Sequence, residues 1–339
     1  MDDQAVIRTY GNTDLPEGAE DRPLVTFALF AYNQEKYVRE AVEGAFSQTY
    51  SPLEIILSDD CSSDRTFEIM EEMAREYQGP HLVKVRRGKV NLGVLAHVLS
   101  VAQLATGEII IVGAGDDISL PERSEVIANA LSGMESLAFS SDDIIIDENG
   151  QRRDWDLGRI ERRRAWHAAN IAWIHGASAA YKANFLKELP VPSSAIFYED
   201  MVLSDLIALV SGSSIRSNQP LIKYRYHFRN LSNRLSDSNS PRDVENQAIV
   251  RWQRARDAKK YCIDFLMACK AEDQISKSVA NRLKLEYEHL RHATNWQRAR
   301  LFDRLKWLYF ATRTGNTKSA LARVFGQRLF FALKSVRYA

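Results

Sequence analysis

The chain has 339 residues, with 45 Lys and Arg against 44 Asp and Glu, 45% hydrophobic residues and 26% charged residues. This composition is typical of a globular protein of one or two domains, and it excludes a fully disordered chain, a fibre and a disulfide-stapled miniprotein. The three cysteines, Cys61, Cys262 and Cys269, have no CxxC spacing. We therefore expect neither a disulfide framework nor a zinc knuckle, and we expect a reducing, cytoplasmic compartment.

Charge is distributed unevenly along the chain. Residues 296–339 contain ten Lys and Arg and one acid, Asp303, so this segment carries +9 while the whole chain carries +1. The first residues, MDDQAVIRTYGN, lack the basic start and apolar stretch of a signal peptide. No run approaches the roughly 18 apolar residues of a membrane-spanning helix. We expect a protein that does not cross a membrane and whose basic tail has a partner of its own.

The first part of the chain is predicted to alternate strands and helices. Residues 1–22 are polar and acidic without a regular period, so we expect a flexible lead-in with order beginning near residue 24. Strict alternation then predicts an α/β fold with a mostly parallel sheet and helices on both faces. The expected strands are 25–30, 53–57, 82–85 and 108–112, and the expected helices are 35–48, 65–77, 94–105 and 121–131.

After residue 133 the alternation is lost. Two further strands are expected at 137–140 and 144–147, and a short helix from Lys182. From Pro241 the pattern is helical, with no further Pro and with Gly only at 315 and 326. We therefore predict an α/β domain over residues 23–235, divided near residue 133 into two halves, and a helical appendage over 241–339.

Polar clusters follow three of the expected strands, namely AYN at 31–33, DDCSSD at 59–64 and GAGDD at 113–117. Ligands of open α/β sheets bind beyond the carboxyl ends of the strands, so we expect these clusters to meet at one crevice. Asp59 and Asp60 could accept a hydrogen bond from a nucleobase, and Asp116 and Asp117 offer oxygen ligands for a Mg²⁺ or Mn²⁺ that holds a diphosphate. Each pair by itself is also typical of a solvated turn.

A third acidic pair precedes the amphipathic run MVLSDLIALV. Glu199 and Asp200 at the start of this predicted helix could simply be favoured by the helix dipole. Alternatively, one of the two carboxylates is a general base, held rigidly within reach of the hydroxyl that it activates.

Together these segments resemble a known family. The run VTFALFAYNQEKYVREAVEGAFSQTYSPLEIILSDDCSSDRT is similar to the opening of the family 2 inverting glycosyltransferases, which have the GT-A fold. NLG at 91–93, TGEIIIVGAGDD at 106–117, HGAS at 175–178, YED at 198–200 and YRYHFRNLSN at 224–233 follow in the family's order. The resemblance covers residues 24–233, and it implies a GT-A domain with a nucleotide half at 23–133 and an acceptor half at 134–235.

The resemblance also implies roles for individual residues. Tyr32 would pack on the nucleobase and Asp60 would accept from it, with Asp59 beside them. Asp116 would contact the ribose or the metal-bound diphosphate, Asp117 would coordinate Mn²⁺ or Mg²⁺, and Asp200 would be the catalytic base. The remaining assignments are Ala31, Asn33, Glu35 and Asn91 to the nucleotide, Glu199, His175 and Gly176 to the sugar or acceptor, and His227 to the metal or a phosphate. Glu35 is also read as helix surface, and His227 as an exposed strand histidine.

The chain departs from the family pattern at two positions. Family members often carry an additional acid where this chain has Ala114, which implies one carboxylate fewer at the metal. Their usual Gly after the first acidic pair is Cys61 here, which predicts a negative backbone φ at that position.

These expectations describe a metal-dependent inverting glycosyltransferase that moves a sugar from a nucleoside diphosphate to a hydroxyl of a glycan or lipid-linked acceptor, in the synthesis of cell-surface polysaccharides or glycoconjugates. Residues 219–233, with Arg225 and His227, are expected to close over the diphosphate. Two alternatives are a non-catalytic nucleotide-sugar binding module that acts through its helical tail, and a nucleotidyltransferase on a related sheet, which would release pyrophosphate.

The tail combines basic residues with six aromatic residues between Trp307 and Phe331. Basic amphipathic helices of this kind favour anionic lipid surfaces, which would place the protein at the inner face of the cytoplasmic membrane. The alternative is a helical subdomain that packs on the catalytic domain or on a second copy of the chain. Nucleic acid is not an expected partner, because no binding module accompanies the charge.

Overall fold

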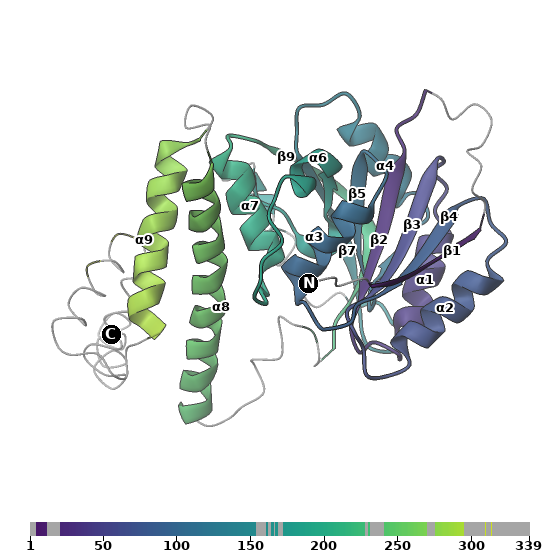
Figure 1. Cartoon of the computed structure of the whole chain (residues 1–339), viewed down its shortest axis with the longest axis horizontal. Coiled ribbons are helices and arrows are strands. Elements are labelled where there is room, and N and C mark those ends of the chain that lie inside the picture. The colour runs from purple at the N-terminus through teal and green to yellow at the C-terminus, as the bar shows by residue number, and fades with distance from the viewer. Residues whose placement is uncertain are drawn as a thin grey trace. The chain divides into compact units, whose positions relative to one another are not determined.

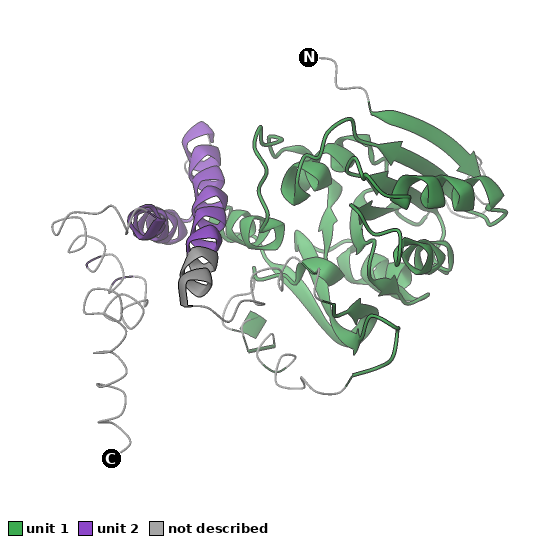
Figure 2. Cartoon of the chain, turned by 90° about the horizontal axis from the view of Figure 1, so that it is seen from below, with its two compact units in different colours: residues 1–233 green, residues 234–339 purple. Residues whose placement is uncertain are grey.

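The computed structural model describes residues 5–11, 21–153, 161, 164–165, 167–168, 172–227, 230, 241–269, 275–294, 309 and 313, with the side chains of 241–248 excepted. The chain divides into two compact units, residues 1–233 and 234–339 (Figure 2). The first unit contains the described sheet, and the second contains two long helices.

The first unit is built on a nine-stranded sheet of order β1-β4-β3-β2-β5-β8-β7-β9-β6. The strands are β1 (Val6–Gly11), β2 (Val25–Ala31), β3 (Leu53–Asp59), β4 (Leu82–Arg87), β5 (Ile109–Ala114), β6 (Ile118–Ser119), β7 (Ala138–Ile146), β8 (Ala180–Lys182) and β9 (Ser214–Arg225). Strands β4, β3, β2 and β5 are parallel, and β8 is antiparallel to both β5 and β7. The expected α/β fold is confirmed, and its four central strands are parallel, but the sheet as a whole is mixed, with four parallel and four antiparallel pairings. The two strands expected between 137 and 147 are one continuous strand.

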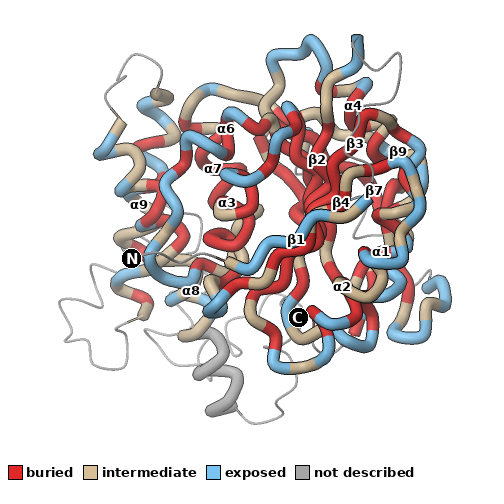
Figure 3. Tube along the Cα trace, turned by 45° about the vertical axis from the view of Figure 1, so that its right-hand side comes forward, coloured by how far each residue is buried: buried red, intermediate tan, exposed pale blue. Residues whose placement is uncertain are grey.

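Helices cover both faces of this sheet (Figure 1). They are α1 (Val38–Phe46), α2 (Thr66–Glu76), α3 (Val94–Leu104), α4 (Arg123–Leu131), α6 (Ala183–Lys187) and α7 (Glu199–Leu209), with one 3₁₀ turn, η1 (Gly176–Ser178). Phe27 and Leu29 of β2 share one buried cluster with α1, α2 and α4, while α3 packs on the opposite face. The central strands are buried almost completely (Figure 3), because both faces are covered.

Strand β1 differs from the sequence expectation, which placed no regular structure before residue 24. Val6–Gly11 pair antiparallel with β4 at the edge of the sheet, from Val6 opposite Arg87 to Gly11 opposite Leu82. Val6 and Ile7 are exposed. This strand is held by its backbone pairing rather than by a buried side-chain row, so the hydrophobic pattern gives little sign of it.

The register of the parallel strands sets the position of the polar clusters. Ala31 lies opposite Asp59, and Phe30 lies opposite Ala114. The amide of Asp60 donates to the Ala31 carbonyl at 3.0 Å, and the amide of Gly115 donates to the Phe30 carbonyl at 2.8 Å. The three clusters therefore meet at one edge of the sheet, as the sequence predicts.

The second unit contains α8 (Pro241–Ala268) and α9 (Lys277–Thr294), which pack on each other. Their buried residues include Tyr261, Cys262 and Leu283. The helical appendage is thus observed over the part that the structure describes, whereas the basic tail from residue 296, apart from Tyr309 and Arg313, lies outside the described residues. Within the described ranges, no helix combines the length and the apolar character needed to span a bilayer.

Glu54 of β3 is a buried carboxylate that joins three segments. It accepts hydrogen bonds from the Thr26 hydroxyl at 2.6 Å, the Thr106 amide at 2.9 Å and the Lys84 ammonium at 2.5 Å. Burial acts to raise the pKa of Glu54, but these three donors outweigh burial and the pKa lies below its ordinary value. The ionised form therefore stabilises the fold above the unfolded pKa, and this stability is lost as the pH falls through the folded pKa.

We predict that Glu54→Gln lowers the free energy of unfolding by about 2 kcal/mol at pH 7, because a charge-assisted bond is lost and the amide cannot accept from all three donors. The difference from the unmodified protein should shrink as the pH falls through the lowered pKa of Glu54, because the carboxylate itself then takes up a proton. Urea unfolding across this pH range measures both effects. Glu72→Gln, which breaks an exposed pair with Arg39, is the control, with an expected change below about 0.5 kcal/mol. Equal effects of the two substitutions would contradict the prediction.

Candidate functional site

Asp60 lies at the carboxyl end of β3 and is 3% exposed. Its carboxylate accepts from the amides of Leu92 at 2.9 Å and Gly93 at 3.0 Å. Burial raises the pKa of Asp60, and these two amide donors oppose that effect. The NLG segment at 91–93 is thus brought to the acid that sequence analysis assigns to the nucleobase, and Asn91 caps the same turn through a 3.0 Å bond to the Gly93 amide.

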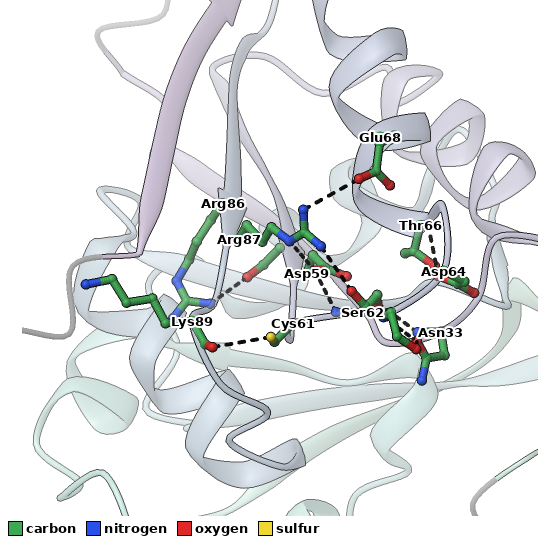
Figure 4. Close-up of polar contacts among 12 residues, drawn as sticks. Asn33, Asp59, Cys61, Ser62, Asp64, Thr66, Glu68, Arg86, Arg87 and Lys89 are labelled. Atoms are coloured by element: carbon green, nitrogen blue, oxygen red, sulfur yellow. Dashed lines mark hydrogen bonds and ion pairs between the residues drawn. The ribbon is translucent and has the colours of Figure 1, made fainter.

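Asp59, beside Asp60, is fully buried. One of its oxygens accepts from the Ser62 amide at 2.9 Å and faces the Arg87 guanidinium at 3.7 Å (Figure 4). Arg87 also donates to the Ser62 carbonyl at 3.1 Å and pairs with Glu68 at 3.5 Å. These contacts are directed at the protein, so Asp59 holds the turn after β3 in shape.

The loop after β2 carries the other residues expected at the nucleotide. Tyr32 is 38% exposed, so its ring is accessible next to the buried end of β2 at Ala31. Asn33 has a positive φ of 53° and accepts from the Ser63 amide at 2.9 Å. Glu35 accepts from the Arg65 amide at 3.0 Å and donates its own amide to Asp64 at 3.1 Å. Asn33 and Glu35 therefore join this loop to the turn after β3.

Cys61 corrects one expectation. Its φ is +64°, in the left-handed region, and not negative as the sequence suggested. The thiol is half-buried and contacts the Lys89 carbonyl at 3.3 Å (Figure 4). The turn after the first acidic pair therefore has a glycine-like conformation, which a side chain occupies at some cost.

The second acidic pair follows β5 and differs between its two members. Asp116 is partly exposed, and its Oδ2 lies 3.1 Å from Nε2 of His227. Asp117 is 5% exposed, and its Oδ1 accepts from the Arg225 amide at 2.8 Å. Burial, the neighbouring charge of Asp116 and the charge of Asp143 raise the pKa of Asp117. The structure therefore brings the partly exposed Asp116 together with His227, while Asp117 bonds to the backbone of Arg225. His227 is 7% exposed and follows the end of β9, so it is not the exposed strand histidine that the sequence also allowed.

The third pair stands in the first turn of α7, with both carboxylates half-buried. Gly176 packs against it so closely that a Cβ there would lie 2.6 Å from Oε1 of Glu199 and 3.2 Å from Cβ of Asp200. Burial and the charge of Asp200 raise the pKa of Glu199 to about 8. Glu199 is therefore mostly protonated at neutral pH, and the HGAS segment lies directly against the acidic pair.

A chain of contacts links the three pairs. The amide of Gly93 donates to Asp60, and a Cβ on Gly93 would lie only 2.9 Å from Cβ of Ala195. The Leu95 amide donates to the carbonyl of Ile196, just before α7, at 3.2 Å. His175, the residue before Gly176, has its Nδ1 3.9 Å from the Asp143 carboxylate. The charge of Asp143 in turn helps to raise the pKa of Asp117. The three acidic pairs therefore belong to one region at the carboxyl edge of the sheet.

Two residues of this region were missed by sequence analysis, Asp143 and Tyr37. Asp143 lies in β7, whose sequence AFSSDDIII places two adjacent acids inside a strand, and this is the signal that could have found it. Tyr37 precedes α1, and its ring lies 4.9 Å from the His227 ring. The contact between Tyr37 and His227 is visible only in the tertiary structure, because the two residues lie far apart along the chain.

The metal-binding capacity of the region rests on few groups. Over the described ranges, no set of three or more His, Cys, Asp and Glu side chains is arranged to hold a metal ion. The pair of Asp116 and His227 offers one oxygen and one nitrogen ligand at the partly exposed position, and Asp117 has one oxygen committed to Arg225. These groups fit a cation that takes its remaining ligands from a bound phosphate or water.

Comparison with protein families gives one match, to the model described as glycosyl transferase family 2, over residues 26–189. A glycosyltransferase of Haemophilus influenzae, itself uncharacterized, is 32% identical over 230 residues, covering 63% of this chain and 68% of that protein. An uncharacterized protein of Mycobacterium tuberculosis is 41% identical over 94 residues, and the match spans only 27% of the length of either chain.

Two solved structures share the fold. TarS of S. aureus in complex with UDP-GlcNAc has a TM-score of 0.52 and 17% identity, covering 87% of this chain and 81% of TarS. The mannosyltransferase PcManGT of Pyrobaculum calidifontis, in complex with GDP-Man and Mn²⁺, has a TM-score of 0.54 and 17% identity, covering 92% of this chain and 89% of that one. At this identity the likeness concerns the fold.

We predict that Cys61→Gly is more stable than Cys61→Ala by about 1 kcal/mol, because only glycine adopts a φ of +64° without steric cost. Both substitutions remove the thiol contact with Lys89, so their difference isolates the backbone effect. Urea unfolding of the two variants measures it. An alanine variant as stable as the glycine variant would show that position 61 carries no backbone strain.

Glu199→Gln should alter the pH dependence of stability. The folded pKa of about 8 lies above the ordinary value of 4.5, so wild-type stability is full below the unfolded pKa and is lost as the pH rises through the folded pKa. The amide does not ionise, so the free energy of unfolding of the variant should rise relative to that of the wild type as the pH rises, by about 3 kcal/mol between pH 5 and pH 8. Thermal unfolding between pH 5 and pH 8 tests this. The exposed Glu188→Gln is the control, and parallel pH profiles for wild type and Glu199→Gln would rule out the buried, protonated carboxyl.

Proposed function

Because this chain belongs to glycosyltransferase family 2 and has the GT-A fold, we propose that it transfers a sugar from a nucleoside diphosphate to an acceptor hydroxyl with inversion at the anomeric carbon. The observation that carries the proposal is the convergence of Asp60, the Asp116–His227 pair and Asp200 on one edge of the sheet. We assign the transfer to residues 23–235.

The nucleobase is proposed to bind between Tyr32 and Asp60. An exposed aromatic ring offers a stacking surface, and a carboxylate accepts from a ring N–H such as N3–H of uracil or N1–H of guanine. Asp60 already accepts one bond on each oxygen from a backbone amide, which orients the carboxylate and leaves further lone pairs. The solved neighbours are complexes with UDP-GlcNAc and GDP-Man, which supports a nucleoside diphosphate sugar as donor.

Asp116 and His227 are the residues that we propose to hold a divalent cation. When bound, Mn²⁺ or Mg²⁺ would neutralise the charge that develops on the leaving diphosphate. Asp117 was also assigned to the metal, and its Oδ2 stays a candidate ligand, although its Oδ1 serves the Arg225 amide. Ala114, in place of a further acid, is consistent with a small ligand set.

Asp200 is proposed as the general base. It would take the proton of the acceptor hydroxyl as that oxygen attacks the anomeric carbon from the face opposite the diphosphate, and the bond from the anomeric carbon to the phosphate oxygen breaks. Glu199 stays largely protonated at neutral pH, so it does not compete for that proton. One ionised carboxylate suffices, because the diphosphate leaves as an anion.

The acceptor is proposed to be a glycan or lipid-linked saccharide of a surface polysaccharide or glycoconjugate. It would enter over residues 134–235, near His175 and Gly176, which lie against the acidic pair of α7. The basic segment 296–339 is the proposed membrane contact, on the grounds of its sequence.

Asp200→Asn tests the mechanism. Transfer from UDP-GlcNAc or GDP-Man in the presence of Mn²⁺ should fall by about 10²- to 10⁴-fold in kcat, because the amide accepts no proton, while donor binding measured by calorimetry is retained. The exposed Glu188→Gln, directly after α6, is the control and should leave kcat unchanged. Wild-type turnover by Asp200→Asn would remove this residue from the mechanism, and release of pyrophosphate instead of a nucleoside diphosphate would exclude a glycosyl transfer.

A further inference from the structure

Arg225, at the end of β9, is 1% exposed, and its guanidinium contacts three separate segments. Nε donates to the Asp116 carbonyl at 2.9 Å, and Nη1 approaches the carbonyls of Asp147 and Glu148 at 3.4 and 3.3 Å. Nη2 pairs with the Glu40 carboxylate of α1 at 3.0 Å. Sequence analysis expected Arg225 to close over a diphosphate, but its guanidinium is directed at protein atoms and is shielded from solvent.

The backbone of Arg225 adds two more contacts to this arrangement. Its amide donates to Asp117 at 2.8 Å, and its carbonyl accepts from the Asn230 side chain at 3.0 Å. The Asn230 oxygen in turn accepts from the His227 amide at 2.6 Å. Asn230 thus closes a turn between Arg225 and His227, and the position of the imidazole follows from that of Arg225.

Tyr37 joins the two side chains from the other side. The Arg225 guanidinium lies 4.9 Å from the centre of the Tyr37 ring, and the His227 ring centre lies 4.9 Å from it at an interplanar angle of 31°. Tyr37 is 8% exposed, so this contact is largely shielded from water. One aromatic ring therefore supports both the guanidinium and the imidazole.

Together these contacts hold Asp116 and His227 at a fixed distance from each other. Arg225 holds the backbone of Asp116 through Nε, and it holds His227 through the turn and through Tyr37, so it positions both partners of the 3.1 Å pair. A planar guanidinium can bond to several segments at fixed angles, which a lysine ammonium on a flexible stem cannot do. Residues that orient metal ligands in this manner typically contribute about 10- to 100-fold to metal affinity.

We propose that Arg225 is a positioning residue that assembles Asp116 and His227 into a binding pair for a divalent cation, with Glu40 as its counter-ion. The inference rests on the proposed function only in taking that pair as a cation site. Arg225 itself touches neither the cation nor the sugar donor.

Mn²⁺ binding to the full chain tests this directly. The probe is MnCl₂, titrated with and without UDP or GDP and followed by the electron paramagnetic resonance signal of free Mn²⁺. Arg225→Lys keeps the positive charge but loses the planar guanidinium and its several fixed donors, so we expect the Kd for Mn²⁺ to rise by about tenfold or more. Binding of UDP or GDP without metal should stay at the wild-type level, because the base site at Asp60 is separate from Arg225. A general loss of structure would weaken both.

The matched control is Arg39→Lys on α1, whose guanidinium is exposed and pairs with Glu72 at 3.3 Å. It should bind Mn²⁺ as the wild type does. Glu40→Gln is the second variant in case Arg225→Lys does not fold, since the Glu40 side chain is 47% exposed and its replacement spares the core. We expect it to raise the Kd for Mn²⁺ by about threefold, because the pair with Arg225 becomes a weaker, neutral hydrogen bond.

The outcomes separate this inference from the proposed function. The positioning role would be overturned if a folded Arg225→Lys variant binds Mn²⁺ with wild-type affinity, even if transfer is observed. If Arg225→Lys does not fold, wild-type Mn²⁺ affinity in Glu40→Gln would overturn it instead. The inference would also be overturned if the wild-type chain binds no Mn²⁺ when MnCl₂ is titrated alone, with UDP and with GDP. No cation site would then exist for Arg225 to assemble. Weakened Mn²⁺ binding together with unchanged nucleotide binding supports it, whichever sugar and acceptor the protein uses.

Discussion

The arrangement of this site depends on the parallel pairing of β2 with β3 and β5. A parallel ladder places the carboxyl ends of neighbouring strands at one edge, and here it sets Ala31 opposite Asp59 and Phe30 opposite Ala114. Every polar cluster after these strands is therefore delivered to the same place. A slip of one residue in the pairing of β3 with β2 would turn Asp59 toward the opposite face of the sheet and remove this convergence.

Delivering acids to a buried edge has an energetic cost, and the structure meets it in a different way at each pair. Asp60 accepts from two backbone amides, and Asp117 accepts from the Arg225 amide. Glu199, enclosed next to Asp200 and Gly176, has a raised pKa and keeps its proton near neutral pH. In this way the buried acids beside Asp116 and Asp200 are either hydrogen-bonded or protonated, which limits the cost of enclosing them.

Small residues have a related role in this region. A Cβ on Gly115 would lie 2.6 Å from Oε1 of Gln34 and 2.8 Å from Cβ of Ala31, and one on Gly176 would meet Glu199. Glycine at these two positions lets the loops after β5 and before β8 approach their neighbours closely. In the motifs GAGDD and HGAS, the glycine therefore leaves room for neighbouring side chains beside the acids or the histidine.

Sequence alone was enough to predict the α/β alternation, four strands and four helices between residues 24 and 131, and the acids at strand ends, because hydrophobic periodicity and motif spacing are local properties. The two-residue strand β6 in the same range was not predicted. The sequence also did not predict β1, whose pairing needs no buried side-chain row, nor the positive φ of Cys61. The bonding partners of each acid emerge only from the folded chain, as does the contact of Arg225 with backbone carbonyls and Glu40. Those features depend on contacts between residues such as Tyr37, Asp116 and His227, which lie far apart along the chain and become neighbours only when the sheet forms.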